Sequence, residues 1–233
     1  MKELFTVVAA AGKGTRVGAD VNKAFLQIRK FPLLVHTLKA LSKFPLCEDV
    51  AVVVGKAETE YAEKLVAEYK KEFPALNCKV VAGGRERQDS VHHALKSMAE
   101  EYKLIAVHDG ARPFITEELF SRVYTTAKEK GAAIPAVKSP DTVKAVRNGL
   151  VERTVDRSKL VLVQTPQIFS ARMFALSYEN AYKMDFRGTD DAAIVEFFGF
   201  RIVVVEGDYQ NIKITTPADV KIADMRYKEN NEH

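Results

Sequence analysis

The chain has 233 residues, which is long enough for one large α/β domain or for one domain with an extension. Hydrophobic residues make up 47% and charged residues 28% of it, an ordinary globular composition, and the formal net charge of +4 is too small to require a nucleic acid partner. Because the chain has neither a signal-peptide pattern nor an apolar run of membrane-spanning length, we expect a cytoplasmic protein that binds no nucleic acid and no membrane.

The first predicted element is a buried strand over residues 4–10, which runs into a glycine-rich loop. Residues 9–16 read Ala-Ala-Ala-Gly-Lys-Gly-Thr-Arg. Glycine lets backbone N–H groups approach an anion, and Lys13 and Arg16 add positive charge, so the loop predicts a phosphate site. Neither the GxxxxGK[ST] spacing nor the GxGxxG spacing occurs in this segment, so an ordinary ATPase or dinucleotide site is not expected.

Apolar, β-rich runs then alternate with amphipathic helical patterns over most of the chain. The further predicted strands are 49–54, 78–82, 104–108, 132–137, 161–164 and 201–205. The predicted helices are 33–43, 58–72, 90–101 and 117–130. This alternation predicts an α/β fold, with a mainly parallel twisted sheet flanked by helices and with ligands bound at the carboxyl ends of the strands.

Several polar residues have a purely structural interpretation. Cys47 and Cys78 lie in apolar runs and are expected to be reduced thiols. His92 and His93 lie within a predicted helix and are expected to be structural. Four acids near predicted helix starts are interpreted as support for the helix dipole: Glu117, Glu118, Asp191 and Asp219.

Residues 138–158 interrupt the α/β pattern. They read as two short strands around an Asn148-Gly149 turn, which predicts a β-hairpin. The hairpin has few large apolar residues, and an isolated hairpin is marginally stable in water. We therefore expect one domain over residues 1–233 from which residues 138–158 protrude as an arm, exchanged between the subunits of a homodimer.

Three polar clusters follow predicted strands: residues 83–90, 108–113 and 211–215. Because the carboxyl ends of parallel strands meet at one edge of a sheet, these clusters converge on one cleft with the first loop. Cations and hydroxyls dominate them. The GxSxG, HExxH and CxxC motifs are absent, so neither a serine nucleophile nor a protein-caged zinc is expected.

Such a site suits the positioning of two polyanions, which is the demand of phosphoryl or nucleotidyl transfer. An attacking phosphate is already ionised, so no general base is required. His108 is therefore interpreted as a structural residue at a strand end. For Asp109 three roles stay open: binding of Mg²⁺, binding of a ribose hydroxyl, or capping of a turn.

Seven motifs in this order make the chain resemble the 2-C-methyl-D-erythritol 4-phosphate cytidylyltransferases of isoprenoid biosynthesis from about residue 4 to residue 227. They are Ala-Ala-Gly-Lys-Gly-Thr-Arg at 10–16, Arg-Gln-Asp-Ser-Val at 87–91, His-Asp-Gly-Ala-Arg-Pro at 108–113, Thr-Val-Asp-Arg at 154–157, Thr-Pro-Gln at 165–167, Thr-Asp-Asp-Ala at 189–192 and Asn-Ile-Lys-Ile-Thr at 211–215. The resemblance implies a Rossmann-like nucleotidyltransferase fold. It also implies transfer of a cytidylyl group from CTP to the methylerythritol phosphate, with release of pyrophosphate.

The resemblance further implies a set of residues around CTP. Four residues of the first loop would wrap CTP with backbone groups: Ala10, Ala11, Gly12 and Gly14. Gly84 and Ser90 would read the cytosine and its surroundings. Arg16 and Lys23 would stabilise the pentavalent phosphorus and the leaving pyrophosphate. Mg²⁺ or another divalent cation would bridge the triphosphate oxygens, largely without protein ligands.

A second set is implied around the polyol phosphate acceptor. Asp109 and Arg112 would help to place the ribose and the acceptor. Lys213, together with Arg157 from the other subunit's arm, would position the acceptor phosphate for in-line attack. Three threonines would line the acceptor pocket: Thr142, Thr165 and Thr189.

The chain departs from the family pattern at two places. Asn22 and Ala24 flank Lys23 where the family usually has Pro and Gln, and Arg85 follows Gly84 where an acid is common. Two other functions are open: a ribitol-5-phosphate cytidylyltransferase, or a non-catalytic nucleotide-binding module. The arm sequence at 154–157 favours methylerythritol phosphate, and a module that only binds would not need both Arg16 and Lys23.

Overall fold

A computed structural model of the chain describes residues 1–12, 22–98 and 100–229. Its centre is an eight-stranded sheet in which the strands follow the order β5, β4, β1, β6, β11, β7, and both β10 and β12 pair with β7. The strands are β1 (Lys2–Ala9), β4 (Asp49–Val54), β5 (Asn77–Ala82), β6 (Tyr102–Asp109), β7 (Ala132–Lys138), β10 (Val161–Val163), β11 (Gln167–Ser170) and β12 (Val203–Glu206). All seven predicted strands are therefore present.

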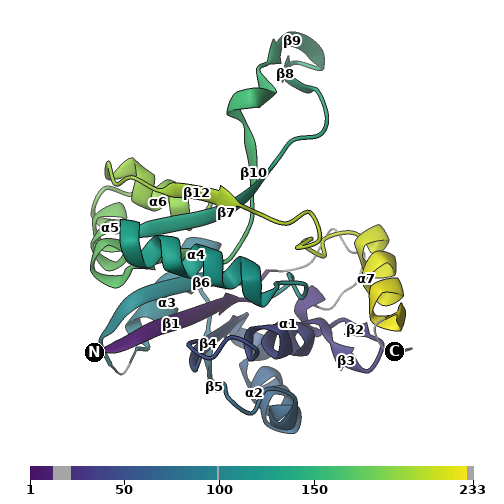
Figure 1. Cartoon of the computed structure of the whole chain (residues 1–233). Coiled ribbons are helices and arrows are strands. Elements are labelled where there is room, and N and C mark those ends of the chain that lie inside the picture. The colour runs from purple at the N-terminus through teal and green to yellow at the C-terminus, as the bar shows by residue number, and fades with distance from the viewer. Residues whose placement is uncertain (13–21, 99, 230–233) are drawn as a thin grey trace.

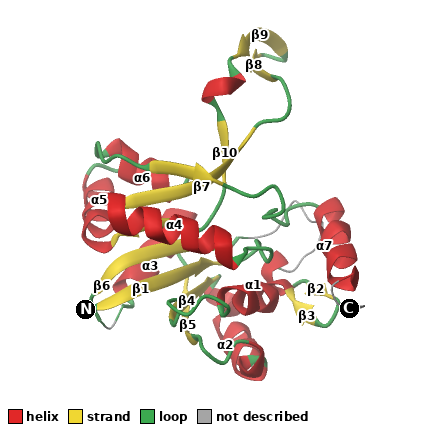
Figure 2. Cartoon of the chain, viewed as in Figure 1, coloured by secondary structure: helices red, strands yellow, loops and turns green. Residues whose placement is uncertain are grey.

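The four strands β5, β4, β1 and β6 are parallel to one another. In β4, β1 and β6 the central residues are mostly apolar and buried on both faces, as expected for a parallel sheet that helices cover on each side, whereas β5 is an edge strand and only partly buried. In β4, for example, Val52 packs into the core on one face and Val53 into the core on the other. The predicted α/β class, a mainly parallel twisted sheet flanked by helices, is confirmed (Figure 2).

Two layers of helices cover this sheet. On one face lie α1 (Leu33–Leu41), α2 (Thr59–Glu68) and α4 (Glu117–Lys130). On the other lie α3 (Arg87–Lys96), α5 (Ala171–Lys183) and α6 (Asp191–Phe197). The last helix, α7 (Pro217–Glu229), packs beside the short hairpin of β2 (Gln27–Ile28) and β3 (Phe31–Pro32). Within the described residues, no helix combines the length and the apolar character that crossing a bilayer requires.

Strand β11 was not predicted. It runs antiparallel between β6 and β7, with Ile168 opposite both Ala106 and Ala133. It has only four residues, begins with Gln167 and leads directly into α5, which was also not predicted. A run this short has no periodicity to detect, so its place in the sheet depends on the two strands beside it.

Helix α3 begins at Arg87 and not at the predicted residue 90. Glu86 is its N-cap, and a capping box joins Glu86 to Asp89. Ser90 is therefore the fourth helical residue, and its N–H group already donates to the carbonyl of Glu86 at 3.0 Å. The N–H group of Ser90 is therefore not available to a ligand, although its hydroxyl lies beside the loop that precedes the helix.

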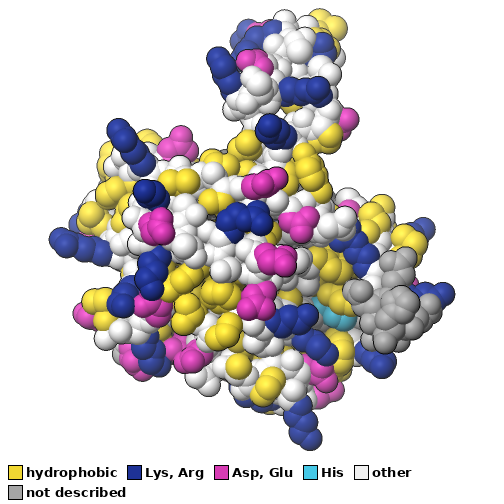
Figure 3. Space-filling view, in the orientation of Figure 1, with side chains coloured by type: hydrophobic (Ala, Val, Ile, Leu, Met, Phe, Trp, Pro, Cys, Tyr) yellow, Lys and Arg dark blue, Asp and Glu magenta, His cyan; other side chains and the backbone are white. Residues whose placement is uncertain are grey.

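The predicted hairpin is confirmed as β8 (Val143–Arg147) and β9 (Leu150–Val155), which project from the body of the molecule (Figure 1). Asn148 and Gly149 have φ values of 50° and 80°, the left-handed conformation that a two-residue hairpin turn requires. Leu150 is 74% exposed and Val151 63% exposed. Figure 3 shows basic and apolar side chains exposed together on this arm.

Candidate active site

A cavity of about 620 Å³ opens at the carboxyl ends of β1, β4, β5 and β6. Each of these strands ends in a segment that lines it, which confirms the expected convergence of the first loop with the clusters at 83–90, 108–113 and 211–215. Eight predicted site residues line the cavity: Ala10, Ala11, Gly12, Lys23, Gly84, Ser90, Asp109 and Lys213. Gly14 and Arg16 lie outside the described residues.

The charge of the cavity wall is predominantly positive. Among the described lining residues, five carry a cation, namely Lys23, Lys56, Arg85, Arg87 and Lys213. Only three carry a carboxylate, and these are Glu58, Glu86 and Asp109. A concave surface with an excess of cations concentrates the field of those cations, so it favours a polyanionic ligand.

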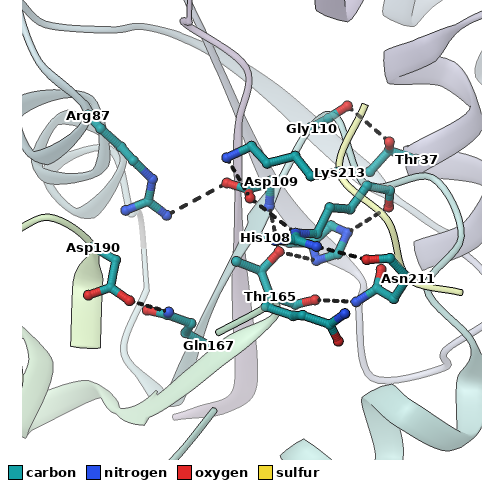
Figure 4. Close-up of polar contacts among 12 residues, drawn as sticks. Thr37, Arg87, His108, Asp109, Gly110, Thr165, Gln167, Asp190, Asn211 and Lys213 are labelled. Carbon is teal, nitrogen blue, oxygen red and sulfur yellow. Dashed lines mark hydrogen bonds and ion pairs between the residues drawn. The ribbon is translucent and has the colours of Figure 1, made fainter. Parts of the chain in front are cut away.

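Asp109, at the end of β6, is the centre of the polar network (Figure 4). Its Oδ2 atom lies 2.9 Å from Nζ of Lys213 and 3.2 Å from Nε of Arg112, and its Oδ1 atom lies 4.0 Å from Nη2 of Arg87. Burial by itself would raise the pKa of the Asp109 carboxyl, but the three cations outweigh that effect and hold its pKa well below the ordinary range. Asp109 is therefore ionised at neutral pH and holds three cations together.

Arg87 and Asp191 form a second buried link that the sequence analysis did not predict. Nη1 of Arg87 lies 2.6 Å from Oδ2 of Asp191. This aspartate is fully buried, and its Oδ1 atom accepts a 2.6 Å hydrogen bond from the hydroxyl of Tyr178. The interpretation of Asp191 as simple dipole support is therefore wrong, because its carboxylate is the counter-ion of a cation in the cavity wall. Arg87 lay within the cluster at 83–90, but its partner is more than a hundred residues away.

His108 precedes Asp109 and is fully buried behind the cavity. The hydroxyl of Thr165 accepts a hydrogen bond from the Asp109 N–H group, so its proton is free to be donated to Nδ1 of His108, 3.1 Å away. Nε2 of His108 then donates to the carbonyl of Arg112 at 3.0 Å. Burial lowers the pKa of His108 to about 4, so the ring is neutral and both nitrogens are engaged, as expected of a structural residue.

Two predicted acceptor residues lie close to the network but not on the cavity wall. Thr165 is 5% exposed, and its hydroxyl joins the Asp109 backbone to His108, so it supports the site from behind. Arg112 is turned inward to Asp109 and to the carbonyl of Asn211, 2.7 Å from its Nη1 atom. Both residues therefore hold together the segments that carry Asp109 and Lys213.

The structure does not bring the remaining predicted residues to the cavity of the same chain. Thr142 and Arg157 lie on the arm, where Nη1 of Arg157 donates to the carbonyl of Pro140 at 2.6 Å. Thr189 is exposed and lies between Gly188 and the N-cap residue Asp190. Within one protomer these three side chains are separate from Lys23 and Lys213.

The loop before α3 brings backbone and hydroxyl groups to the cavity. The Gly84 N–H group donates to Oγ of Ser90 at 3.1 Å, and this hydroxyl donates to the carbonyl of Glu86 at 3.0 Å. A Cβ atom on Gly84 would lie 2.3 Å from Cβ of Asp89, so glycine is required for this close approach. These hydrogen bonds hold the loop before α3 in one conformation, so its backbone forms a fixed part of the cavity wall.

The described residues do not form a protein cage for a metal. No group of three or more His, Cys, Asp and Glu side chains with suitable placement occurs among them. The carboxylates of Asp109 and Glu58 already accept hydrogen bonds or ion pairs from neighbouring groups. A divalent cation in this cavity would need most of its oxygen ligands from a bound phosphate compound.

Known proteins with similar sequences belong to the family that the motifs resemble. Residues 4–229 match the sequence profile of the 2-C-methyl-D-erythritol 4-phosphate cytidylyltransferase family. A protein of that name from Bacillus cytotoxicus is 45% identical over 218 residues, which cover 94% of this chain and 95% of the relative. Another, from Geobacter metallireducens, is 41% identical over 229 residues, covering 97% of this chain and 98% of the relative.

Solved structures agree with the sequence relatives. The 4-diphosphocytidyl-2C-methyl-D-erythritol synthase of Anaerococcus prevotii superposes with a TM-score of 0.83 at 30% identity, covering 97% of this chain and 99% of that one. The 2-C-methyl-D-erythritol 4-phosphate cytidylyltransferase of Thermus thermophilus superposes with a TM-score of 0.79 at 30% identity, covering 97% and 99%. With the profile match over nearly its whole length, the chain belongs to the 2-C-methyl-D-erythritol 4-phosphate cytidylyltransferase family.

Proposed function

We propose that this protein transfers the cytidylyl group of CTP to 2-C-methyl-D-erythritol 4-phosphate and releases pyrophosphate. The observation that carries the proposal is the cavity that Lys23 and Lys213 line together with the end of β1 and Asp109. Family membership supplies the identity of the two substrates. The cavity supplies what both of them need, which is a concave surface with an excess of positive charge.

In this reaction an oxygen of the acceptor phosphate attacks the α-phosphorus of CTP. The bond from that phosphorus to the bridging oxygen of the β-phosphate breaks, and pyrophosphate leaves with the electron pair. The attacking phosphate is ionised at neutral pH, so no side chain has to remove a proton. The arrangement of His108, neutral and bonded at both nitrogens, supports a mechanism without a histidine base.

The residues of the chain contribute mainly position and charge. Backbone groups of Ala10, Ala11 and Gly12 would hold the triphosphate, and the Gly84–Ser90 loop would face the base. Lys23 would stabilise the negative charge that grows on the leaving pyrophosphate. Arg16 would act with it, as the resemblance implies. Mg²⁺, bound chiefly by the triphosphate oxygens, would neutralise part of the same charge.

Lys213 would bind the acceptor phosphate and align it for in-line attack. Asp109 holds the Lys213 ammonium at 2.9 Å, so the cation is oriented by a carboxylate and not by solvent alone. We propose that Arg157 and Thr142 reach the acceptor from the arm of a second subunit. Exposed apolar residues on the arm and the separation of Arg157 from the cavity of its own chain support a homodimer.

A pyrophosphate-release assay tests the function. The protein is incubated with CTP, Mg²⁺ and either 2-C-methyl-D-erythritol 4-phosphate or ribitol 5-phosphate. Turnover with the first acceptor alone is expected. Turnover with ribitol phosphate alone would assign the other transferase activity, and CTP binding without pyrophosphate release would indicate a binding module.

We also propose a cytoplasmic location. Cys47 and Cys78 are free thiols, which suits a reducing compartment. Fractionation of cells that produce the protein at its natural level tests the location.

A further inference from the structure

The residue before Lys23 is buried and fully hydrogen-bonded. Asn22 is 5% exposed and is the N-cap of the short helix η2 (Lys23–Phe25). Its Oδ1 atom accepts from the N–H group of Ala24 at 3.0 Å. Its Nδ2 atom donates to the carbonyl of Ala10 at 2.7 Å and to Oε2 of Glu58 at 2.8 Å. Both N–H bonds and the carbonyl of this amide are therefore in use.

Glu58 extends the contact to a third segment of the cavity wall. It is the last residue of the helix η3 (Lys56–Glu58), and its Oε2 atom also accepts from the N–H group of Gly55 at 2.9 Å. Gly55 directly follows β4, and Ala10 directly follows β1. The Asn22 side chain thus ties η2 to the ends of two neighbouring strands.

These contacts determine where the backbone of Lys23 lies. Asn22 is held at Ala10, and the turn continues with hydrogen bonds from Phe25 N to Asn22 O at 2.9 Å and from Leu26 N to Lys23 O at 3.1 Å. Ala24 and Phe25 are buried, so the segment is also anchored beyond the lysine. Both ends of the turn that carries Lys23 are fixed relative to the strand that leads into the first loop.

We infer that Asn22, held by Glu58, is a positioning residue for Lys23. The hydrogen bonds of its amide restrict the backbone before Lys23, as a proline at this position would. The φ of Asn22 is −54°, which lies within the range that a proline ring enforces. The departure from Pro at this position therefore replaces a covalent constraint by three hydrogen bonds. This inference rests on the proposed role of Lys23 at the reacting phosphorus.

Kinetic constants of Asn22→Ala test the inference. A small displacement of a charge-stabilising group can cost about 100-fold in rate, so we expect kcat to fall by about 10- to 100-fold while KM for CTP changes much less. Asn22→Pro should recover part of kcat, because proline restores the backbone constraint without the amide. Glu58→Ala should lower kcat in the same direction.

The decisive comparison is made in the Lys23→Ala background. If Asn22 acts through Lys23, then Asn22→Ala adds no further loss of kcat once Lys23 is gone. The same fold loss in both backgrounds would overturn the inference, and so would a wild-type kcat for Asn22→Ala. If Lys23→Ala itself keeps a normal kcat, the role proposed for Lys23 fails instead. Absence of any pyrophosphate release by the wild type would reject the proposed function.

Matched controls separate positioning from general loss of stability. Glu72 ends the helix η4 (Lys70–Glu72) as Glu58 ends η3, and it pairs with Lys39 away from the cavity. Asn77 begins β5, at the opposite end of the strand from the cavity. Glu72→Ala and Asn77→Ala should keep the wild-type kcat, and thermal midpoints are recorded for all variants. A kcat loss in these controls equal to that of Asn22→Ala would overturn the inference.

Discussion

Nζ of Lys213 lies 2.9 Å from Oδ2 of Asp109, although the two residues are 104 positions apart in the chain. The lysine side chain is 38% exposed and lines the cavity, whereas the aspartate side chain is only 9% exposed. Lys213 can therefore contact a ligand in the cavity, while the Asp109 carboxylate that orients it stays inside the protein.

Asp109→Asn should change how stability depends on acid pH. The folded state holds the pKa of Asp109 well below its ordinary value, so below about pH 4 the unfolded chain takes up a proton that the folded chain does not. The stability that Asp109 contributes is complete above that pH and is lost as pH falls further toward the folded-state pKa. Urea unfolding between pH 5 and pH 3 should therefore show a shallower decline for the variant. The exposed Asp141, changed in the same way, is the control.

His108→Gln should flatten the stability curve in a higher pH range. Burial lowers the pKa of His108 to about 4, whereas an unfolded histidine has a pKa of about 6.5. As pH falls through this window, the unfolded state binds the proton first, and the wild type loses up to about 3 kcal/mol of stability from this group. Thermal or urea unfolding between pH 7 and pH 4 measures the slope. An unchanged slope in His108→Gln, and a changed one in the exposed variant His93→Gln, would contradict the assignment.

Lys23→Ala should lower kcat by about 10²- to 10³-fold, because a charge-stabilising group for the transition state is removed. Binding of CTP, measured by calorimetry, should weaken much less. Lys56→Ala removes another cation of the same wall from an exposed position and is the matched control. A rise in KM with normal kcat in Lys23→Ala would show that the lysine contributes only to binding.

Arg157→Ala should raise KM for the acceptor phosphate and leave CTP binding unchanged. If the arm serves the site of a second subunit, mixed dimers of Arg157→Ala and Lys23→Ala contain one site with both residues intact. At an acceptor concentration far below the KM of Arg157→Ala, where each variant alone is nearly inactive, co-refolding of the two should restore up to about a quarter of wild-type activity, since half of the dimers are mixed and each has one complete site. Lack of any restoration, with dimers verified by light scattering, would place Arg157 outside the shared site.

Arg87→Met should destabilise the protein by about 3 kcal/mol, because the buried carboxylate of Asp191 loses its counter-ion. Arg87→Lys should lose less, since the charge remains without the planar guanidinium. The exposed pair of Lys64 and Glu60 is the control, and Lys64→Ala should cost no more than about 0.5 kcal/mol. Chemical denaturation at pH 7 measures all three, and equal losses for Arg87→Met and Lys64→Ala would refute the buried link.

Much of the fold and part of the site follow from local sequence. The inner parallel strands consist mostly of apolar residues buried on both faces, and this pattern is visible in the residues themselves, as in Val50–Val54. Gly84 could also be selected from the sequence, since the structure requires a glycine where the backbone approaches Asp89 closely. The turn at Asn148 and Gly149 was also predictable from the sequence, because its left-handed backbone favours those residue types.

Other features were decided only by tertiary structure, because their stabilisation comes from partners far away in the chain. Strand β11 exists through its pairing with β6 and β7, and Thr165 faces His108 and not the cavity. Asp191 is a buried counter-ion because α6 packs where Arg87 can reach it. The sequence by itself determined the residue types that concentrate positive charge at the strand ends. Which of those charges face the cavity and which are neutralised inside the protein depended on burial, since a buried charge is stable only where folding brings its counter-ion beside it.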